Sequence, residues 1–219
     1  WAALRAWHNW QPLLGVNRDI FIRSLMLQLV FFSITLQGAR LGDATVAANA
    51  LLLNGLLLAA HALDGLAHAV EALCGHAIGA RDRQALRRSM VVACGWSLLA
   101  SLGFALLFMF GGHLFVQMQT DIPSVRETAF QYLPYLALLP LIAVWSYLLD
   151  GLFIGATRAR EMRDAMVISV VIAFPAAWAL HGYGNHGLWI SFLLFMVLRS
   201  LTLAVYAWRM QRKDQWFGA

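Results

Sequence analysis

Charge is what this sequence has least of. Only 12% of its 219 residues are Asp, Glu, Lys or Arg, and Lys213 is the single lysine. A soluble domain carries roughly 25% charged residues, which keep its surface hydrated. Here 61% of the residues are hydrophobic and the mean hydropathy is +0.66. The composition therefore excludes an ordinary soluble domain and predicts that much of the surface faces lipid.

Cysteine is almost as scarce, and its two positions give no sign of a metal centre. Cys74 and Cys94 both lie inside apolar stretches, without a CxxC motif or a Cys/His ligand spacing. Two such residues cannot form a disulfide framework in a chain of this length. We interpret them as small buried side chains, and we expect no bound metal and no cofactor.

The sequence also lacks a recognisable cleavable signal peptide, and it begins with Trp1 instead of Met. We therefore expect the chain to start partway through a longer polypeptide. In a soluble protein, the formal net charge of +5 would suggest a nucleic-acid partner. Here the arginines form short clusters between apolar runs, a pattern typical of membrane loops, so we expect no nucleic-acid partner.

Long apolar runs predict six transmembrane helices, since a helix crosses the hydrocarbon core in about 20 residues. No Ser/Pro/Gly-rich linker divides the chain, so the expected fold class is all-α, a polytopic membrane protein with one lobe. We assign 1–16 to an interfacial connector, 17–210 to the six-helix lobe and 211–219 to a tail. The expected spans are 19–38, 44–79, 87–111, 125–157, 162–182 and 187–209.

Arginine is distributed unequally between alternate loops, which predicts the orientation. One set of connectors and the two terminal segments are rich in basic residues, whereas the other set contains Arg40 and is followed by Arg126 at the start of the fourth span. Basic loops remain in the cytoplasm. We therefore expect both termini to be cytoplasmic. The basic residues on that side are Arg5, Arg18, Arg81, Arg83, Arg87, Arg88, Arg158, Arg160, Arg163, Arg209, Arg212 and Lys213.

A stripe of polar residues along the second span is the strongest functional signal. Its members lie within an arc of about 100° on a helix, and such groups must face a bundle interior or a water-filled cavity. The acids could exchange a coupling ion or proton and the histidines could relay it. The alternative is a set of hydrogen bonds between helices. The stripe consists of Asn54, His61, Asp64, His68 and Glu71.

Other polar residues at membrane depth extend this candidate site. Asp150 on the fourth span is either a further ion-coupling acid or the partner of an arginine, and Arg23 and Arg199 are the candidate structural charge partners. We place Gln28, Thr35 and Tyr135 with Asn54, His61 and His68 as cavity-lining residues. Pro134 and Pro140 predict a kink or hinge in the fourth span.

Two blocks of sequence resemble one transporter family. Residues 62–82, ALDGLAHAVEALCGHAIGARD, are similar to the eighth helix and following loop of MATE (multidrug and toxic compound extrusion) transporters, in the DinF branch. Residues 150–166, DGLFIGATRAREMRDAM, are similar to the end of the tenth helix of that branch. The six-span pattern extends the resemblance over nearly the whole chain.

The resemblance implies one half of a twelve-helix antiporter. It implies export of amphipathic or cationic compounds in exchange for H⁺ or Na⁺, through a cavity shared with an N-terminal six-helix lobe that is missing from this chain. It also implies that the membrane is a bacterial inner membrane. Sodium-type members place acids on the seventh and tenth helices. Here the seventh-helix equivalent offers Gln28 and no acid, and Asp150 lies closer to the cytoplasmic end than the family's tenth-helix acid.

Three other functions remain open from sequence. A flippase for lipid-linked saccharides would share the fold and would use a cationic cavity, for which Arg23 and Arg199 are the available residues. An intramembrane metal-dependent enzyme would use His61, Asp64, His68 and Glu71 as ligands, although their spacing is not HExxH. A structural or assembly subunit is the third. We expect a transporter of small molecules in the bilayer and no enzymatic activity.

Overall fold

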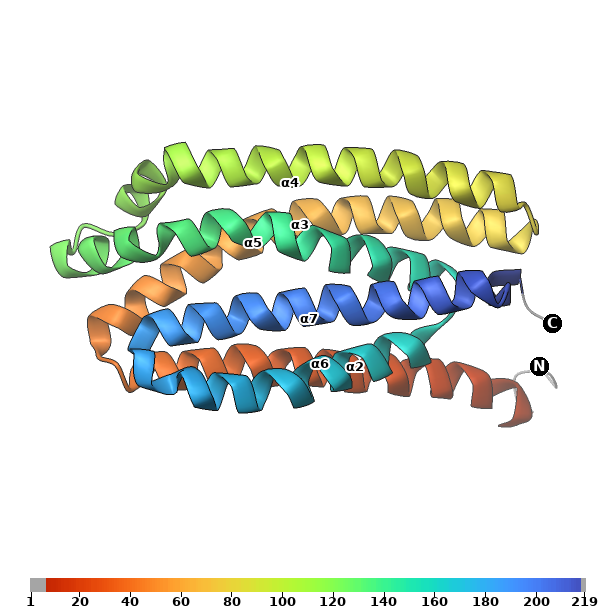
Figure 1. The fold of residues 1–219 in the computed structure, drawn as a ribbon, viewed down its shortest axis with the longest axis horizontal. Coiled ribbons are helices and arrows are strands. Elements are labelled where there is room, and N and C mark those ends of the chain that lie inside the picture. Colours follow the sequence, from red (N-terminus) through yellow and green to blue (C-terminus); the bar gives the residue numbers. More distant parts are fainter. Residues whose placement is uncertain (1–6, 218–219) are drawn as a thin grey trace.

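The computed structural model describes residues 7–217, and over this range the chain forms six long α-helices and two 3₁₀ turns (Figure 1). The helices run back and forth along one long axis, so that consecutive helices are antiparallel. The elements are α2 (Trp7–Ala39), α3 (Asp43–Gly79), α4 (Arg83–Gln119), α5 (Pro123–Gly155), α6 (Ala159–Leu180), η1 (His181–Tyr183), α7 (Gly184–Arg212) and η2 (Gln215–Phe217).

Helix-ending chemistry at the connectors explains why long apolar runs become separate helices. Gly42, at φ 114°, occupies a backbone conformation that side chains disfavour, so the chain turns there without strain. The Asp82 carboxylate accepts a hydrogen bond from the Ala85 amide at 2.9 Å and caps α4. Pro123 occupies the first turn of α5, where a missing amide hydrogen costs nothing.

The helices are long and apolar enough to cross a membrane. Five continuous helical stretches meet this criterion, and the last, Ala159–Arg212, is 54 residues long. That stretch contains both α6 and α7, which turn back at η1 and pack side by side (Figure 1). The described residues therefore form six long helices, and the all-α, six-helix prediction is confirmed.

The observed helices extend beyond several of the expected spans. α2 begins at Trp7 and runs unbroken through residue 16 to Ala39, while residues 1–6 and 218–219 lie outside the described range. α4 continues to Gln119 instead of ending near residue 111. A glycine inside a helix destabilises that helix by about 1 kcal/mol relative to alanine, so Gly111 and Gly112 are weak positions of α4. In the structure, however, Gly112 is buried against Leu133 of α5. Close packing of α4 on α5 thus keeps the helix continuous.

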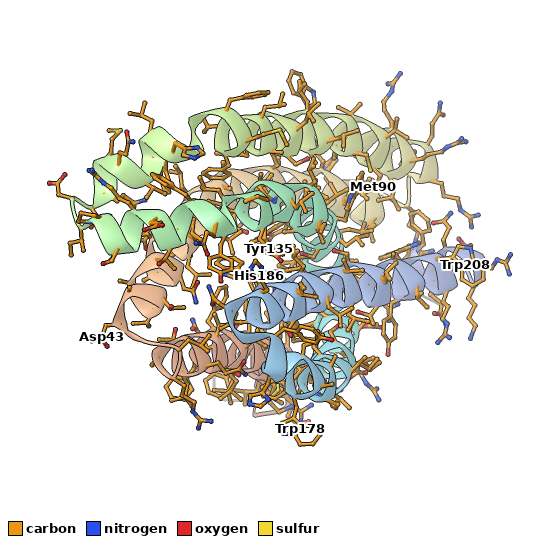
Figure 2. All side chains as sticks on the ribbon, turned by 60° about the vertical axis from the view of Figure 1, so that its left-hand side comes forward. Asp43, Met90, Tyr135, Trp178, His186 and Trp208 are labelled. Carbon is orange, nitrogen blue, oxygen red and sulfur yellow. The ribbon has the colours of Figure 1, made fainter. Side chains whose placement is uncertain are left out.

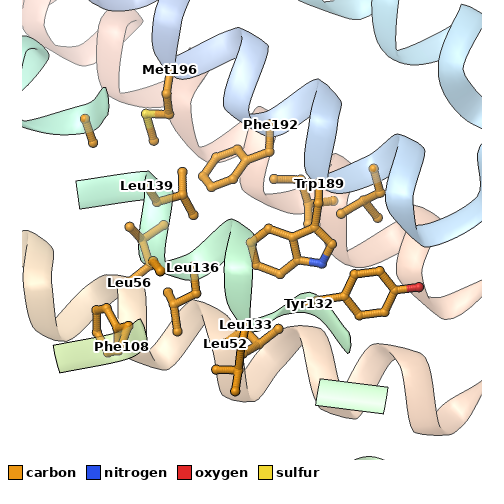
Figure 3. Close-up of a cluster of buried hydrophobic side chains, with 14 of the residues drawn as sticks. Leu52, Leu56, Phe108, Tyr132, Leu133, Leu136, Leu139, Trp189, Phe192 and Met196 are labelled. Carbon is orange, nitrogen blue, oxygen red and sulfur yellow. The ribbon is translucent and has the colours of Figure 1, made fainter. Parts of the chain in front are cut away.

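The apolar core lies where α3 and α5 cross, with α4 on one side and α7 on the other (Figures 1 and 3). The side chains of Trp189 and Phe192 of α7 enter this core. Their rings pack edge to face, with ring planes 73° apart and ring centroids 6.3 Å apart. Leu136 and Leu139 of α5 and Leu52 of α3 are completely buried between them. This core holds α3, α5 and α7 in fixed register.

The outward surface carries large apolar side chains that a soluble protein would bury. Trp178 is 82% exposed on α6, Met118 80% and Phe110 79% on α4. A contiguous surface of this kind exceeds the apolar patches of soluble monomers. This exposed apolar surface is suited to contact with the hydrocarbon chains of lipids.

Glycine allows α3 and α5 to approach closely at one end. A Cβ atom on Gly151 would lie 2.3 Å from the Ala67 carbonyl oxygen, and one on Gly155 would lie 2.5 Å from the Glu71 carbonyl oxygen. No larger residue fits unless the backbones separate. Since Asp150 directly precedes Gly151, this contact brings an acid of α5 beside the polar stripe of α3.

Candidate functional site

Asp150 is the centre of a buried charge cluster that joins three helices. Its Oδ2 atom accepts a hydrogen bond from Arg23 of α2 at 2.5 Å and another from Nη2 of Arg199 of α7. Asp150 is 5% and Arg199 2% exposed. The Arg199 guanidinium also lies 5.7 Å from the centre of the Tyr147 ring, within cation–π distance. Sequence reasoning left two roles open for Asp150, and the structure shows it bonded to both arginines.

The charge cluster leaves two buried polar atoms without a hydrogen-bond partner in the described part of the chain. These are Oδ1 of Asp150 and Nε of Arg199. A buried, unsatisfied polar atom is costly, so it marks a place where water, an ion or a moving group can bind. The cluster is therefore incompletely satisfied as it stands.

A cavity of about 200 Å³ opens beside this cluster. It brings together the three acids that sequence analysis proposed for ion coupling, together with His68 and Arg23. The His68 Nδ1 atom lies 3.3 Å from Oε2 of Glu71. Because Asp64 and Glu71 are only partly buried, the cavity has access to the outside of the lobe. The lining residues are Arg23, Asp64, Ala67, His68, Glu71, Asp150, Gly151 and Ile154.

Four of the residues proposed to line the cavity lie away from it, on the exposed side of α2 and α3. Asn54 and Gln28 are exposed, as is Thr35, whose hydroxyl donates to the Phe31 carbonyl of its own helix. His61 is also exposed, with Nδ1 2.6 Å from the Leu57 carbonyl oxygen. These side chains continue the stripe along the lobe surface, where α2 packs only lightly on α3.

Tyr135 belongs to a separate polar and aromatic cluster with His186 (Figure 2), which lies near the start of α7, whereas Asp150 lies near the end of α5. Its hydroxyl lies 3.0 Å from Nδ1 of His186, and its ring stacks on Trp189 at 6.3 Å. Tyr132 lies 4.8 Å from the His186 ring. Tyr135 is partly exposed there, so it can contact a ligand, although not one held in the Asp150 cavity.

Sequence reasoning missed a buried amide pair beside this aromatic cluster. Asn49 of α3 and Asn185 of α7 exchange two hydrogen bonds, of 2.7 and 3.0 Å, and the Trp189 indole donates to Oδ1 of Asn49 at 2.9 Å. Asn49 lies in an apolar run, and an amide in such a run was the available signal. Its partner, 136 positions away, could not be read from the sequence.

A second missed contact lies at the basic end of the lobe. Asp19, which is 6% exposed, accepts a hydrogen bond from Arg163 of α6 at 2.7 Å and pairs with Arg18 at 3.2 Å. The seventh-helix equivalent, α2, therefore does carry an acid. Asp19 lies near the start of α2 and accepts a hydrogen bond from α6, so it links these two helices. It does not line the Asp150 cavity.

The charges around the cavity favour a cation. Three carboxylates and two guanidinium groups meet there, so the site has one excess negative charge when His68 is neutral. Two of the carboxylates, on Asp64 and Glu71, make no contact with an arginine within the described residues. Among residues 7–217, no three His, Cys, Asp or Glu side chains are arranged to hold a metal ion. An excess of carboxylates attracts cations, and a carboxylate can also take up and release a proton.

Comparisons with known proteins converge on one family. The MatE family model matches residues 20–179. The chain is 43% identical to DNA damage-inducible protein F of Escherichia coli K12, over 98% of this chain and 47% of that protein. It is 28% identical to a probable multidrug resistance protein NorM of Bradyrhizobium diazoefficiens, over 92% of this chain and 50% of that one.

Solved structures agree on the fold. A crystal structure of MATE in complex with MaL6 superposes with a TM-score of 0.82 at 20% identity, covering 94% of this chain and 46% of that one. A MOP superfamily transporter from Pyrococcus furiosus superposes with a TM-score of 0.80, also at 20% identity, covering 94% and 46%. This chain thus spans about half the length of these relatives and structures.

Proposed function

This chain belongs to the MatE family, and from that premise we propose that it is the C-terminal lobe of a secondary antiporter. The antiporter exports amphipathic or cationic drugs or metabolites in exchange for H⁺ or Na⁺. The observation that carries the proposal is the cavity where Asp64, Glu71 and Asp150 meet at one end of α3 and α5. Acids within a membrane bundle are costly and are typical of ion or proton pathways.

Asp64 is the best candidate for the coupling group within this cavity. Asp150 is bonded to two arginines and Glu71 lies beside His68. Asp64 makes no ion pair in the described structure, and its side chain is half-buried. A carboxylate without a fixed counter-charge is the one whose charge can be exchanged against a cation.

The arrangement of the arginines counts against the flippase alternative. A lipid-linked pyrophosphate needs cations that are free to bind it. Arg23 and Arg199 both direct their guanidinium groups at Asp150. The interior of this lobe therefore offers a net acidic cavity, which suits a cationic ligand.

We further propose that transport requires a second lobe. The polar side chains Gln28, Asn54 and His61 are exposed on the face formed by α2 and α3, where they would contact lipid if the lobe stood alone. Moving an amide from water into an apolar environment without a hydrogen-bond partner costs roughly 2–7 kcal/mol, depending on the reference state. A second lobe on this face would cover the stripe and turn it into the wall of a central cavity.

Expression of residues 1–219 alone is expected to give no drug efflux above the empty-vector level in an efflux-deficient bacterium. Co-expression with the half of the E. coli relative that this chain does not match should restore it, because that half supplies the opposite wall. The measurement is accumulation of a fluorescent cationic dye, at matched amounts of membrane-inserted protein. Efflux by residues 1–219 alone, in a form shown to be monomeric, would contradict the two-lobe proposal.

The proposed orientation places both ends of the lobe in the cytoplasm, supported by arginine clusters at the end of the bundle where α2 starts and α7 ends. Single cysteines test it in a Cys74→Ala, Cys94→Ala background. A membrane-impermeant maleimide should label Ser124→Cys and Gly182→Cys in intact cells, and Gln84→Cys only after the membrane is opened. All three positions are exposed. Labelling of Gln84→Cys in intact cells would reverse the orientation.

A further inference from the structure

A cavity of about 510 Å³ lies at the basic end of the lobe, between α4 and the ends of α5 and α7. Its volume is within the range of pockets that hold small ligands, roughly 300–1,000 Å³. The inner wall is apolar and comes from three helices, and η2 closes one side with Trp216 and Phe217. We call this cavity the basal groove. Its apolar wall consists of Leu86, Met90, Val91, Leu149, Leu152 and Ala207.

Basic residues lie on the rim of the basal groove and beside it. Arg83 and Arg87 are four residues apart on α4 and both line the groove, as expected for one helix face. On α7, the Arg212 guanidinium lies 4.0 Å from the centre of the Trp208 ring, and Trp208 also lines the groove. Arg83 is paired with Asp214 of the tail. Within residues 7–217, Arg87 and Arg212 make no ion pair.

The groove lies at the level where helix surfaces change from charged to apolar. Beyond Arg88, the sequence of α4 contains no charged residue as far as Gln119, and Val91 and Trp96 are 65% and 62% exposed. Trp208, 53% exposed on α7, has the amphipathic ring that is enriched at membrane interfaces. Figure 2 shows Met90 and Trp208 at this end of the lobe. The basic rim is thus at headgroup depth and the apolar wall at acyl-chain depth.

We propose that the basal groove binds an anionic phospholipid of the cytoplasmic leaflet, with its phosphate at Arg87, supported by the Arg212 that stacks on Trp208, and an acyl chain along Met90 and Leu149. Basic pockets between helices on the cytoplasmic side suit such headgroups. A second copy of the chain docked here through the same face, by a two-fold axis, would present its own arginines to these ones. An anionic lipid instead supplies a negative charge for the arginines and an acyl chain that can fill the apolar groove.

The test is native mass spectrometry of the full-length protein in a neutral detergent, titrated with phosphatidylglycerol or with phosphatidylethanolamine. Arg87→Gln and Arg212→Gln should each weaken phosphatidylglycerol binding about five-fold, and the double variant about 25-fold, as expected for two surface cations acting independently. Arg88→Gln is the matched control, because Arg88 neighbours Arg87, is also exposed, and neither lines the groove nor stacks on an aromatic ring that does. It should change the affinity less than two-fold.

Three results would overturn the proposal. Equal losses from Arg88→Gln and Arg87→Gln would show diffuse attraction to a basic surface. Equal affinity for phosphatidylethanolamine and phosphatidylglycerol would show that the anionic headgroup is not recognised. Displacement of the bound lipid by millimolar glycerol phosphate would show a site for free phosphate. Because these arginines are exposed, thermal unfolding without lipid should be the same for all variants, which separates lost binding from lost folding.

Discussion

Asp64→Asn is expected to lower cation-driven efflux by the full-length protein at least about ten-fold, the effect of losing an interaction of roughly 1.4 kcal/mol. The substitution keeps the shape of the side chain and one hydrogen-bond acceptor but removes the charge that can be exchanged against a cation. Asp64 lines the cavity beside Asp150 and makes no ion pair in the described structure. Membrane insertion should be unchanged, because asparagine costs less than aspartate in a bundle.

Efflux of a fluorescent cation from vesicles, under an imposed pH or sodium gradient, is the measurement, with protein level matched by immunoblot. Glu71→Gln is the paired control: it removes the same charge from the same cavity wall, but Glu71 already contacts His68 and lies nearer the helix end. We expect it to lower the rate less. Wild-type rates for Asp64→Asn would show that this carboxylate is structural.

Asp150→Asn should reduce the free energy of unfolding of the lobe by about 3–5 kcal/mol, the usual cost of removing one member of a buried ion pair. The loss is large because two guanidinium groups are left facing each other, and Arg199 is almost completely buried. Denaturant or SDS titration of the purified protein, followed by helical circular dichroism, gives the change. Expression in the membrane is expected to fall with it.

Arg23→Gln serves as the comparison for Asp150→Asn. Its side chain is 16% exposed and can reach toward water, and its removal leaves the Asp150–Arg199 pair intact. The expected loss is therefore about 1.5–3 kcal/mol, that of a hydrogen bond to a charged group. If Asp150→Asn and Arg23→Gln had the same small effect, Asp150 would not be the centre of the cluster.

The fold could be predicted from the sequence because a bilayer imposes simple rules on it. Apolar runs of known length and alternating arginine-rich loops are enough to give six helices in one lobe. The exact residues at which the helices begin and end were harder to predict from the sequence. The expected end of a helix near Gly111 was wrong because Leu133 of α5 packs on Gly112, and that contact depends on tertiary structure.

The candidate site could be predicted in part. Asp64, Glu71 and Asp150 were recognisable because acids in apolar runs are conspicuous, and the structure places all three around one cavity. The pairing of Asp150 with two arginines could not be predicted from the sequence, because Arg23 lies 127 positions and Arg199 lies 49 positions from Asp150. Asp19 was overlooked because it lies near the edge of a span, where a charge needs no special explanation.

The buried pairing of Asn49 with Asn185 joins α3 to α7 through a contact that dissolved ions hardly affect. Its amide and indole hydrogen bonds are neutral, so their strength hardly depends on ionic strength. The exposed ion pairs Arg83–Asp214 at one end of the lobe and Arg126–Asp121 at the other are screened by salt, whose Debye length is about 8 Å at physiological concentration. Rising salt should therefore weaken contacts at both ends of the lobe and leave this link between α3 and α7 unchanged.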